Sequence, residues 1–154
     1  MQKFSKLQNN NPKLKMRYAN NSDLRFILKL HNSNVSKNYF FSKRQVNLNE
    51  HKIWFDKQVK EKMLFIFSLK NRIGYVRYDQ IKKNFLSVSI AIKDKYKRKG
   101  FGKKMLYESL KRKKISKFNI IAVIKKQNPI SKKFFLNYGF KYFKKNTYIM
   151  KTGL

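Results

Sequence analysis

The chain has 154 residues, 42% of them hydrophobic and 16% aromatic, which suffices for one folded domain and argues against a disordered chain. It has no cysteine, which excludes disulfides, thiol catalysis and cysteine-based zinc sites. Its formal net charge of +32 favours partners that carry negative charge, such as nucleic acids or phosphate-bearing small molecules.

Apolar periodicity and turn signals predict elements in the order β-α-α-β-β-β-α-β-α-β-β. The expected strands cover residues 14–19, 63–69, 73–79, 85–92, 118–124, 140–143 and 147–150. Ser22, Asn47 and Asn128 are expected to be the N-caps of helices, and a further helix is expected after Gly102. In the strand 85–92, one face is expected to carry Leu86, Val88, Ile90 and Ile92, and the other Ser87, Ser89 and Ala91. Strands that alternate with helices in this way predict an α/β fold, in which a mixed, mostly antiparallel sheet carries helices on both faces.

The start of the chain and one internal segment show no clear periodicity. Residues 1–13 are polar and basic and are expected to form a flexible tail, which leaves 14–154 as a single domain. Residues 32–46 are expected to be irregular and contain an aromatic run, Tyr39-Phe40-Phe41. The final hairpin is a candidate edge for pairing with a second subunit in a homodimer.

The positive charge is spread along the chain and does not form one basic segment. Lysine (32) far outnumbers arginine (7), and asparagine occurs 16 times. Because lysine and asparagine have AT-rich codons, genome composition explains much of this excess, and a nucleic-acid partner is not expected. The polar N-terminus lacks the core of a signal peptide, and no run reaches the ~18 apolar residues of a membrane span, so the expected location is cytoplasmic. His31 and His51 lack the neighbouring carboxylates that would predict a metal site.

A basic turn joins the strand that ends at Ile92 to the next helix, with the sequence Lys97-Arg98-Lys99-Gly100-Phe101-Gly102. Glycines let the backbone approach a ligand closely, and the N–H groups of a helix N-terminus attract anions. With three cationic side chains added, the turn predicts a pyrophosphate cradle, although an ordinary strand–helix turn also carries glycines. It has neither the Gly-Lys-Ser/Thr ending of a P-loop nor the glycine spacing of a dinucleotide-binding turn.

A second segment supports the cradle, since Asn128-Pro129-Ile130-Ser131 is followed by Phe135 and Gly139-Phe140. Both segments resemble motifs of the GNAT superfamily of N-acetyltransferases, usually written Arg/Gln-x-x-Gly-x-Gly/Ala and Asn-x-x-Ser-x-x-x-Tyr-x-x-x-Gly-Phe. Lys97 replaces the usual first residue of the former. Phe135 stands where the superfamily has the tyrosine often assigned as general acid, and neither Tyr138 nor Tyr142 occupies that position. The resemblance covers residues 15–151.

The resemblance implies the GNAT fold and direct attack of an amine on acetyl-CoA, with no covalent enzyme intermediate and no metal. Acetyl-CoA is then expected between the fourth and fifth strands, with its pantetheine arm on the backbone of Ile90 and Ile92. The cofactor-binding residues that the resemblance implies are Ile90, Ile92, Lys97, Arg98, Lys99, Gly100, Phe101, Gly102, Lys103, Asn128, Ser131 and Phe135.

Two further runs, Glu50-His51-x-x-Trp54-Phe55 and Gly74-x-x-Arg77-Tyr78-Asp79, resemble one branch of the superfamily. This branch contains nucleotide-sugar N-acetyltransferases of the pseudaminic and related nonulosonic acid pathways, which acetylate the 4-amino group of a UDP-linked deoxysugar. The branch often has Arg-Asn where this chain has His31-Asn32. The implied substrate-binding residues are His31, Asn32, Trp54 and Arg77. The candidate catalytic residues are Glu50, His51, Asp79 and Ser89.

Each of these residues also has an ordinary structural explanation: Trp54 as core, Arg77 as a solvated strand residue, and Glu50 and His51 as helix-capping residues. Two other functions stay open. A protein N-terminal acetyltransferase of the ribosomal-protein type takes a cationic peptide amine, which this basic surface repels unless acids line the groove. A basic protein bound to RNA explains the charge but not the spacing of the glycines and of Asn128 and Ser131.

Overall fold

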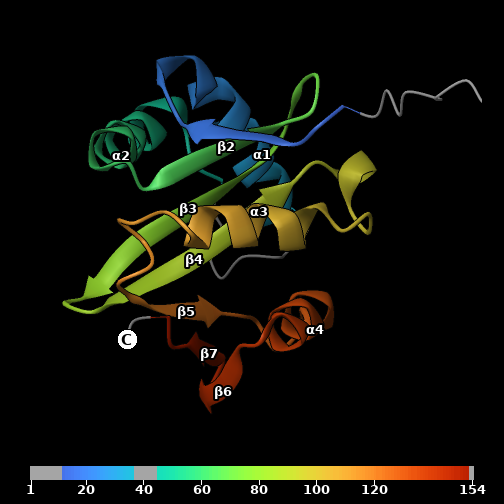
Figure 1. Cartoon of the computed structure of the whole chain (residues 1–154). Helices are drawn as coiled ribbons and strands as arrows, with labels where there is room; N and C mark the ends of the chain where they lie inside the picture. Colours follow the sequence, from blue (N-terminus) through green and yellow to red (C-terminus); the bar gives the residue numbers. More distant parts are fainter. Residues whose placement is uncertain (1–11, 37–44, 153–154) are drawn as a thin grey trace, which may run out of the picture.

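The computed structural model describes residues 12–36 and 45–152. Their strands form one sheet in the order β1-β2-β3-β4-β5-β7-β6 (Figure 1). The strands are β1 (Lys15–Tyr18), β2 (Leu64–Ser68), β3 (Arg72–Lys82), β4 (Phe85–Ile92), β5 (Asn119–Val123), β6 (Lys141–Lys144) and β7 (Thr147–Met150). Neighbouring strands are antiparallel except β4 and β5, which run parallel. The predicted mixed, mostly antiparallel sheet is confirmed.

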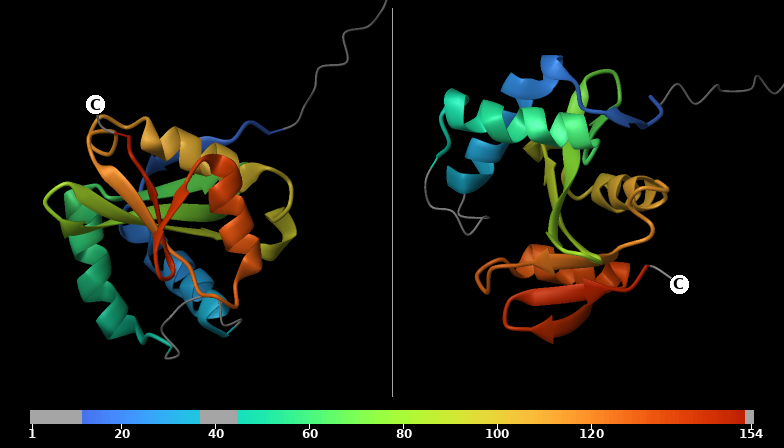
Figure 2. Two further views of the ribbon diagram at one scale, coloured as in Figure 1. Left: turned by 90° about the horizontal axis from the view of Figure 1, so that it is seen from below. Right: turned by 90° about the vertical axis from the view of Figure 1, so that its left-hand side faces the viewer.

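Helices cover both faces of the sheet, as predicted. Helices α1 (Leu24–Ser36) and α2 (Leu48–Glu61) lie on one side of β3 and β4, and α3 (Phe101–Leu110) lies on the other (Figure 2). The remaining helix, α4 (Pro129–Tyr138), follows β5, and two short 3-10 helices are η1 (Asn21–Asp23) and η2 (Asp94–Tyr96). In the described part of the chain, each helix is too short or too polar to cross a bilayer.

Strand β4 separates two hydrophobic cores. Leu86 and Val88 pack in the core that contains Met105 of α3, whereas Ala91 packs in the core that contains Ile27 and Phe55 of α1 and α2. This alternation follows from the two-residue period of a strand. It confirms the faces predicted from the sequence and places the side chain of every second β4 residue toward α1 and α2.

The predicted caps of two helices are confirmed. The side chain of Asn47 accepts a hydrogen bond from the Glu50 N–H (2.9 Å), and that of Asn128 accepts one from the Ser131 N–H (3.2 Å). Pro129 then opens α4, and Gly139 ends it with a φ of 123°. The same local bonding rules that place Asn at helix starts therefore set the ends of the helices next to the site.

The N-cap predicted at Ser22 is wrong, because Asn20 takes this position. The Asn20 side chain accepts the Ser22 N–H (3.0 Å), and the Asp23 carboxylate accepts the Asn20 N–H (2.9 Å), which completes a capping box. The chain therefore enters a 3-10 turn one residue after Asn20, before α1 begins.

The irregular segment predicted from residue 32 is also partly wrong, because α1 continues to Ser36. Leu30 and Asn34 are both buried and lie one helical turn apart. Because polar residues occupy the buried face of α1 here, the sequence does not show the helical spacing of apolar residues. The aromatic run 39–41 and residues 1–11 of the predicted tail lie outside the described residues.

Gly74 on β3 allows α3 to pack closely on the sheet. A Cβ atom at this position would lie 2.3 Å from the Ala91 carbonyl oxygen and 3.0 Å from the Met105 Cε. We expect Gly74→Ala to lower the free energy of unfolding by about 2–3 kcal/mol, because backbone must move to relieve the clash. Urea denaturation measures this loss, and an unchanged midpoint would contradict the packing described.

Candidate active site

Strands β4 and β5 separate partway along their length. Their ladder joins Phe85–Ser87 to Asn119–Ile121 and ends there. On the other side of β4, the Lys93 N–H donates to the Ile73 carbonyl (2.8 Å). Because backbone groups alternate in direction along a strand, the N–H and C=O groups of Ile90 and Ile92 face the β5 side, beyond the end of the ladder. An extended ligand would therefore find a strand edge to pair with here.

The turn after β4 leads directly to the N-terminus of α3. Arg98 and Gly100 adopt left-handed conformations, with φ values of 61° and 80°. The Lys104 N–H is bonded to the Gly100 carbonyl (3.4 Å), so the N–H groups of Phe101, Gly102 and Lys103 lie in the first turn, where a helix offers them no carbonyl partner. These N–H groups and the positive end of the helix dipole suit a phosphate group.

The cations of the cradle differ in their surroundings. Lys97 forms an ion pair with Asp94 (Nζ to Oδ1, 2.9 Å), which neutralises part of its charge. Arg98, Lys99 and Lys103 are exposed. The positive charge available to a bound pyrophosphate would therefore come mainly from these three side chains and from the backbone.

Gly102 lies where α3, α4 and β4 meet. A Cβ atom there would lie 3.2 Å from the Phe134 Cε2 and 3.3 Å from the Ile92 Cδ1. Phe134 is thus the α4 residue packed against the cradle. Phe135, implied as a cofactor contact by the resemblance, is 7% exposed and packs edge-on against Phe134 and Phe140 in the core.

The two tyrosines near the usual general-acid position have different surroundings. Tyr138 on α4 is half-buried and packs near Phe140, and burial raises the pKa of its hydroxyl, with a further contribution from Tyr107. Tyr142 is 66% exposed and packs against Tyr148. The Tyr138 hydroxyl therefore stays protonated near pH 7 and can donate a hydrogen bond.

On the opposite face, β3 and β4 bring together the candidate acceptor residues. Arg77 and Ser89 are directly opposite each other in the ladder, so their side chains share the face toward α1 and α2. The Arg77 guanidinium lies over the Trp54 ring of α2, 5.0 Å from its centroid. The α2 helix and the two strands therefore build one cluster from positions that are far apart in the sequence.

The Asp79 carboxylate holds this cluster in place. Its Oδ2 lies 2.9 Å from the Arg77 Nε, and its Oδ1 accepts a hydrogen bond from the Gln58 Nε2 (2.6 Å). The Nε of Arg77 is itself buried, whereas the side chain as a whole is 24% exposed. Asp79 thus has both oxygens occupied, and its ion pair holds the Arg77 guanidinium in a fixed, partly exposed position.

Two histidines lie beside Arg77. His51 is buried, with its ring 5.2 Å from that of Trp54, and its Nε2 makes no hydrogen bond to the described residues. Burial and the Arg77 charge lower the pKa of His51, against an opposing interaction with the Leu24 backbone. Burial, followed by the charges of Arg77 and His51, lowers the pKa of His31 to about 4. Both imidazoles are therefore neutral near pH 7, which leaves Arg77 as the cation of this cluster.

The lowered pKa of His31 predicts a pH dependence of stability. The unfolded chain protonates this histidine near the ordinary histidine pKa of 6.5, whereas the folded protein does so only at about 4. The free energy of unfolding should therefore fall as the pH falls through this window. The full shift corresponds to about 3 kcal/mol. Because solvent screens a partly exposed group, we expect the fall to be smaller by only about 1 kcal/mol in His31→Gln. Urea titrations at the two ends of the window test this, and parallel losses in both proteins would contradict it.

Two other candidates have different surroundings. The Asn32 side chain donates to the Val46 carbonyl and accepts from the Val46 N–H (both 3.0 Å), so its amide holds the two ends of the segment between α1 and α2. Glu50 is exposed in the first turn of α2. The structure thus brings His31, His51, Trp54, Arg77, Asp79 and Ser89 to one region and uses Asn32 for local bonding.

Sequence reasoning missed Gln58 and Phe134. Gln58 is four residues after Trp54 and is 4% exposed. A polar residue within a buried helical stripe was the available signal. Phe134 carries no such signal, since nothing in its spacing distinguishes it from Phe135.

Residues 13–141 match the family model described as an acetyltransferase (GNAT) domain. Among curated protein sequences, none matches significantly. The fold is similar to a ribosomal-protein-alanine N-acetyltransferase from Brucella melitensis (TM-score 0.76, 19% identity, 84% of this chain and 86% of that chain covered). It is also similar to a phosphinothricin acetyltransferase from Sinorhizobium meliloti in complex with acetyl-CoA (TM-score 0.75, 21% identity, 85% of this chain and 76% of that chain covered). A third similar structure is spermidine N-acetyltransferase from Vibrio cholerae with CoA and spermine (TM-score 0.70, 21% identity, 88% of this chain and 91% of that chain covered). Because the family model covers most of the sequence, the chain belongs to the GNAT family of acetyltransferases.

Proposed function

We propose that this acetyltransferase moves the acetyl group of acetyl-CoA to the 4-amino group of a UDP-linked amino-deoxysugar. The main support is the Arg77 cluster, in which a partly exposed guanidinium is held against Trp54 and Asp79. A diphosphate is a strong partner for such a guanidinium, because charge-assisted hydrogen bonds are stronger than neutral ones. The neutral histidines add no competing charge.

We place the coenzyme along the edge of β4 that faces β5, beyond the end of their ladder. The strand edge at Ile90 and Ile92 suits a pantetheine arm, and the N-terminus of α3 with Arg98 and Lys99 suits the pyrophosphate. Asn128 caps α4 by accepting the Ser131 N–H, and a Cβ atom at Gly102 would crowd Phe134 and Ile92. Ser89 would lie between the two proposed sites, since the backbone of its neighbour Ile90 faces the β5 side and its own side chain lies on the same face of the sheet as Arg77.

In the proposed reaction the amine attacks the thioester carbonyl, loses a proton and releases the CoA thiol. Positioning supplies most of the rate increase, and proton removal supplies the rest. His51 is the base that we propose, because its imidazole is neutral and its Nε2 has no hydrogen bond among the described residues. The engagement of Asp79 with Gln58 and Arg77 makes it a positioning residue.

A peptide amine is the second candidate acceptor, favoured by the similarity of fold to the Brucella melitensis enzyme. The Arg77 cluster speaks against it, because a cationic N-terminus is repelled by an adjacent guanidinium and the nearby carboxylate of Asp79 is already paired.

Release of free CoA thiol from acetyl-CoA, measured with UDP-4-amino-4,6-dideoxysugars beside peptide amines, tests the proposal. We expect release with the amino-sugars and none above background with the peptides. Turnover with peptides alone would reject the nucleotide-sugar acceptor. Failure of acetyl-CoA to bind would reject the cradle itself.

A further inference from the structure

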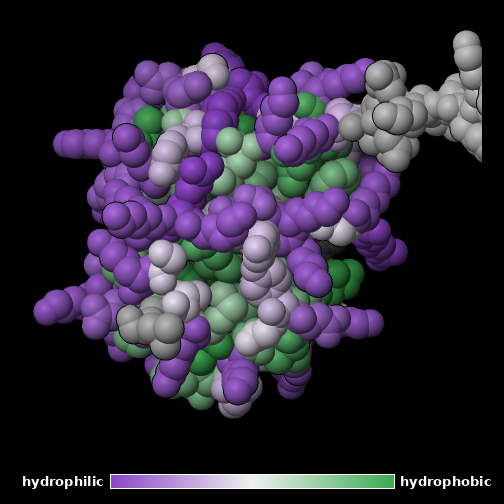
Figure 3. All heavy atoms as spheres, in the orientation of Figure 1, coloured by the Kyte–Doolittle hydropathy of each residue, from purple (hydrophilic) through white to green (hydrophobic). Residues whose placement is uncertain are grey.

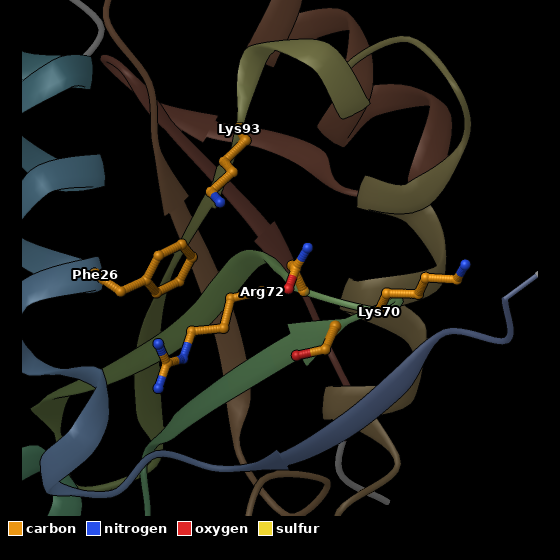
Figure 4. A pocket seen from close by; sticks show the side chains of 6 residues that line it. Phe26, Lys70, Arg72 and Lys93 are labelled. Carbon is orange, nitrogen blue, oxygen red and sulfur yellow. The ribbon is translucent and has the colours of Figure 1, made fainter.

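We propose that a pocket of about 410 Å³ between α1 and the β2–β3 turn binds a small phosphate-bearing molecule, separately from the coenzyme. Figure 4 shows the side chains around it, and its lining residues are Phe26, Ser68, Lys70, Asn71, Arg72 and Lys93. Three of the six are cations and none is an acid. This inference is independent of the acceptor proposed above, because none of these residues belongs to the Arg77 cluster.

The guanidinium of Arg72 is fixed in the wall of the pocket. Its Nε forms an ion pair with the Asp23 Oδ1 (2.8 Å), and its NH2 group donates to the Ser22 hydroxyl (3.0 Å) and carbonyl (3.2 Å). Asp23 is fully buried and is also bound by both terminal nitrogens of Arg17 (2.7 and 2.8 Å). A cation held in one position loses little conformational entropy when an anion binds, which favours binding.

The Phe26 ring brings a second cation close to Arg72. The Lys93 Nζ lies 5.4 Å from the ring centroid, and the Arg72 Cζ lies 5.9 Å from it. In Figure 4 the Lys93 ammonium and the Arg72 guanidinium lie on either side of the Phe26 ring, whereas Lys70 points away from it. Two cations beside one ring repel each other, and an anion bound next to them would relieve this repulsion.

The local charges favour a ligand with more than one negative charge. Arg17, Arg72 and Lys93 carry three positive charges, and the Asp23 carboxylate carries one negative charge, so this group has a surplus of two positive charges. Ser68 and Asn71 add neutral hydrogen-bonding groups, and Phe26 adds an apolar surface. These features suit a phosphate group attached to a small organic body.

The pocket lies apart from the coenzyme cradle. Phe26 packs with the core beneath α1 and α2, whereas Tyr96 and Phe101, which flank the cradle, pack with the core beneath α3. The sheet separates these two cores. Hydrophilic side chains cover much of the face drawn in Figure 3, and the chain has 39 lysine and arginine residues, so a test must separate the pocket from the other cations of the protein.

Calorimetric titration with inorganic pyrophosphate, at constant ionic strength and with CoA saturating the cradle, tests the proposal. We expect Lys93→Gln to weaken pyrophosphate binding about 10-fold, because one charge-assisted contact is lost. The matched control is Lys113→Gln, which changes the net charge by the same amount. Lys113 lies far from the pocket, because the next residue, Lys114, donates to the Glu61 carbonyl at the end of α2 and before β2 begins. We expect this control to change binding by less than about twofold.

A second measurement locates the bound probe. The aromatic NMR signals of Phe26, assigned by their loss in Phe26→Leu, should shift on addition of pyrophosphate in the wild type. Equal weakening by both lysine changes, or an unshifted Phe26, would overturn the pocket as a site. Loss of the Phe26 shift in saturating CoA would show that a phosphate of the coenzyme occupies it, which would overturn a separate ligand. None of these outcomes depends on which amine accepts the acetyl group.

Discussion

Arg77→Met should lower kcat/KM for a UDP-amino-sugar about 100-fold while the KM for acetyl-CoA changes by less than about twofold. The guanidinium lies over Trp54 on the α1 and α2 side of the sheet, whereas the cradle adjoins the core beneath α3. Removing it takes away the charge that would bind the diphosphate and leaves the cradle untouched. Steady-state kinetics with each substrate varied in turn separates the two effects.

Two variants show whether the loss comes from binding or from structure. Arg77→Lys keeps the charge but loses the planar guanidinium, so we expect it to recover part of the activity. Gln58→Leu removes the hydrogen bond to Asp79 without changing the charge, and we expect it to raise the KM for the acceptor with little change in the pH profile. If Arg77→Met, folded by circular dichroism, acts on the amino-sugar as well as wild type, the assignment of Arg77 to the diphosphate fails.

Gly102→Val should lower kcat/KM for acetyl-CoA about 100-fold, because displacement of a binding group by about 1 Å has a cost of this size. Even a Cβ atom at this position approaches Phe134 and Ile92 within 3.2 and 3.3 Å, and valine adds two methyl groups. The N-terminus of α3 must then move away from β4, and its N–H groups lose their alignment. Kinetics and direct titration with CoA measure the loss.

The same contact provides a rescue experiment. Phe134→Ala removes the ring that meets position 102, so Gly102→Val should lose less affinity for CoA in this background than in the wild type. Gly100→Asn is the control for backbone conformation, since asparagine tolerates the φ of 80° and a Cβ there meets nothing within 4 Å. Additive effects of the Gly102 and Phe134 changes would mean that this contact does not position the cradle.

The sequence by itself determined the elements, the two motifs and the family resemblance. These depend on local chemistry: Asn47 and Asn128 cap their helices through side chains that reach only three residues ahead, and the alternation along β4 assigns its two faces. Where local signals compete, they mislead. Asn20 and Asp23 form a capping box that displaces the cap predicted at Ser22.

Only the tertiary structure decided which side chains of the site contact one another. Gln58 meets Asp79 across 21 residues of sequence, and Arg77 meets Trp54 because α2 packs on the face of β3 where Arg77 points. The lowered pKa of each histidine depends first on burial and then on the neighbouring Arg77, and no spacing in the sequence reports either one. Phe134 meets the cradle because α4 docks against Gly102. Each of these contacts forms between separate elements, so it exists only after the sheet has brought them together.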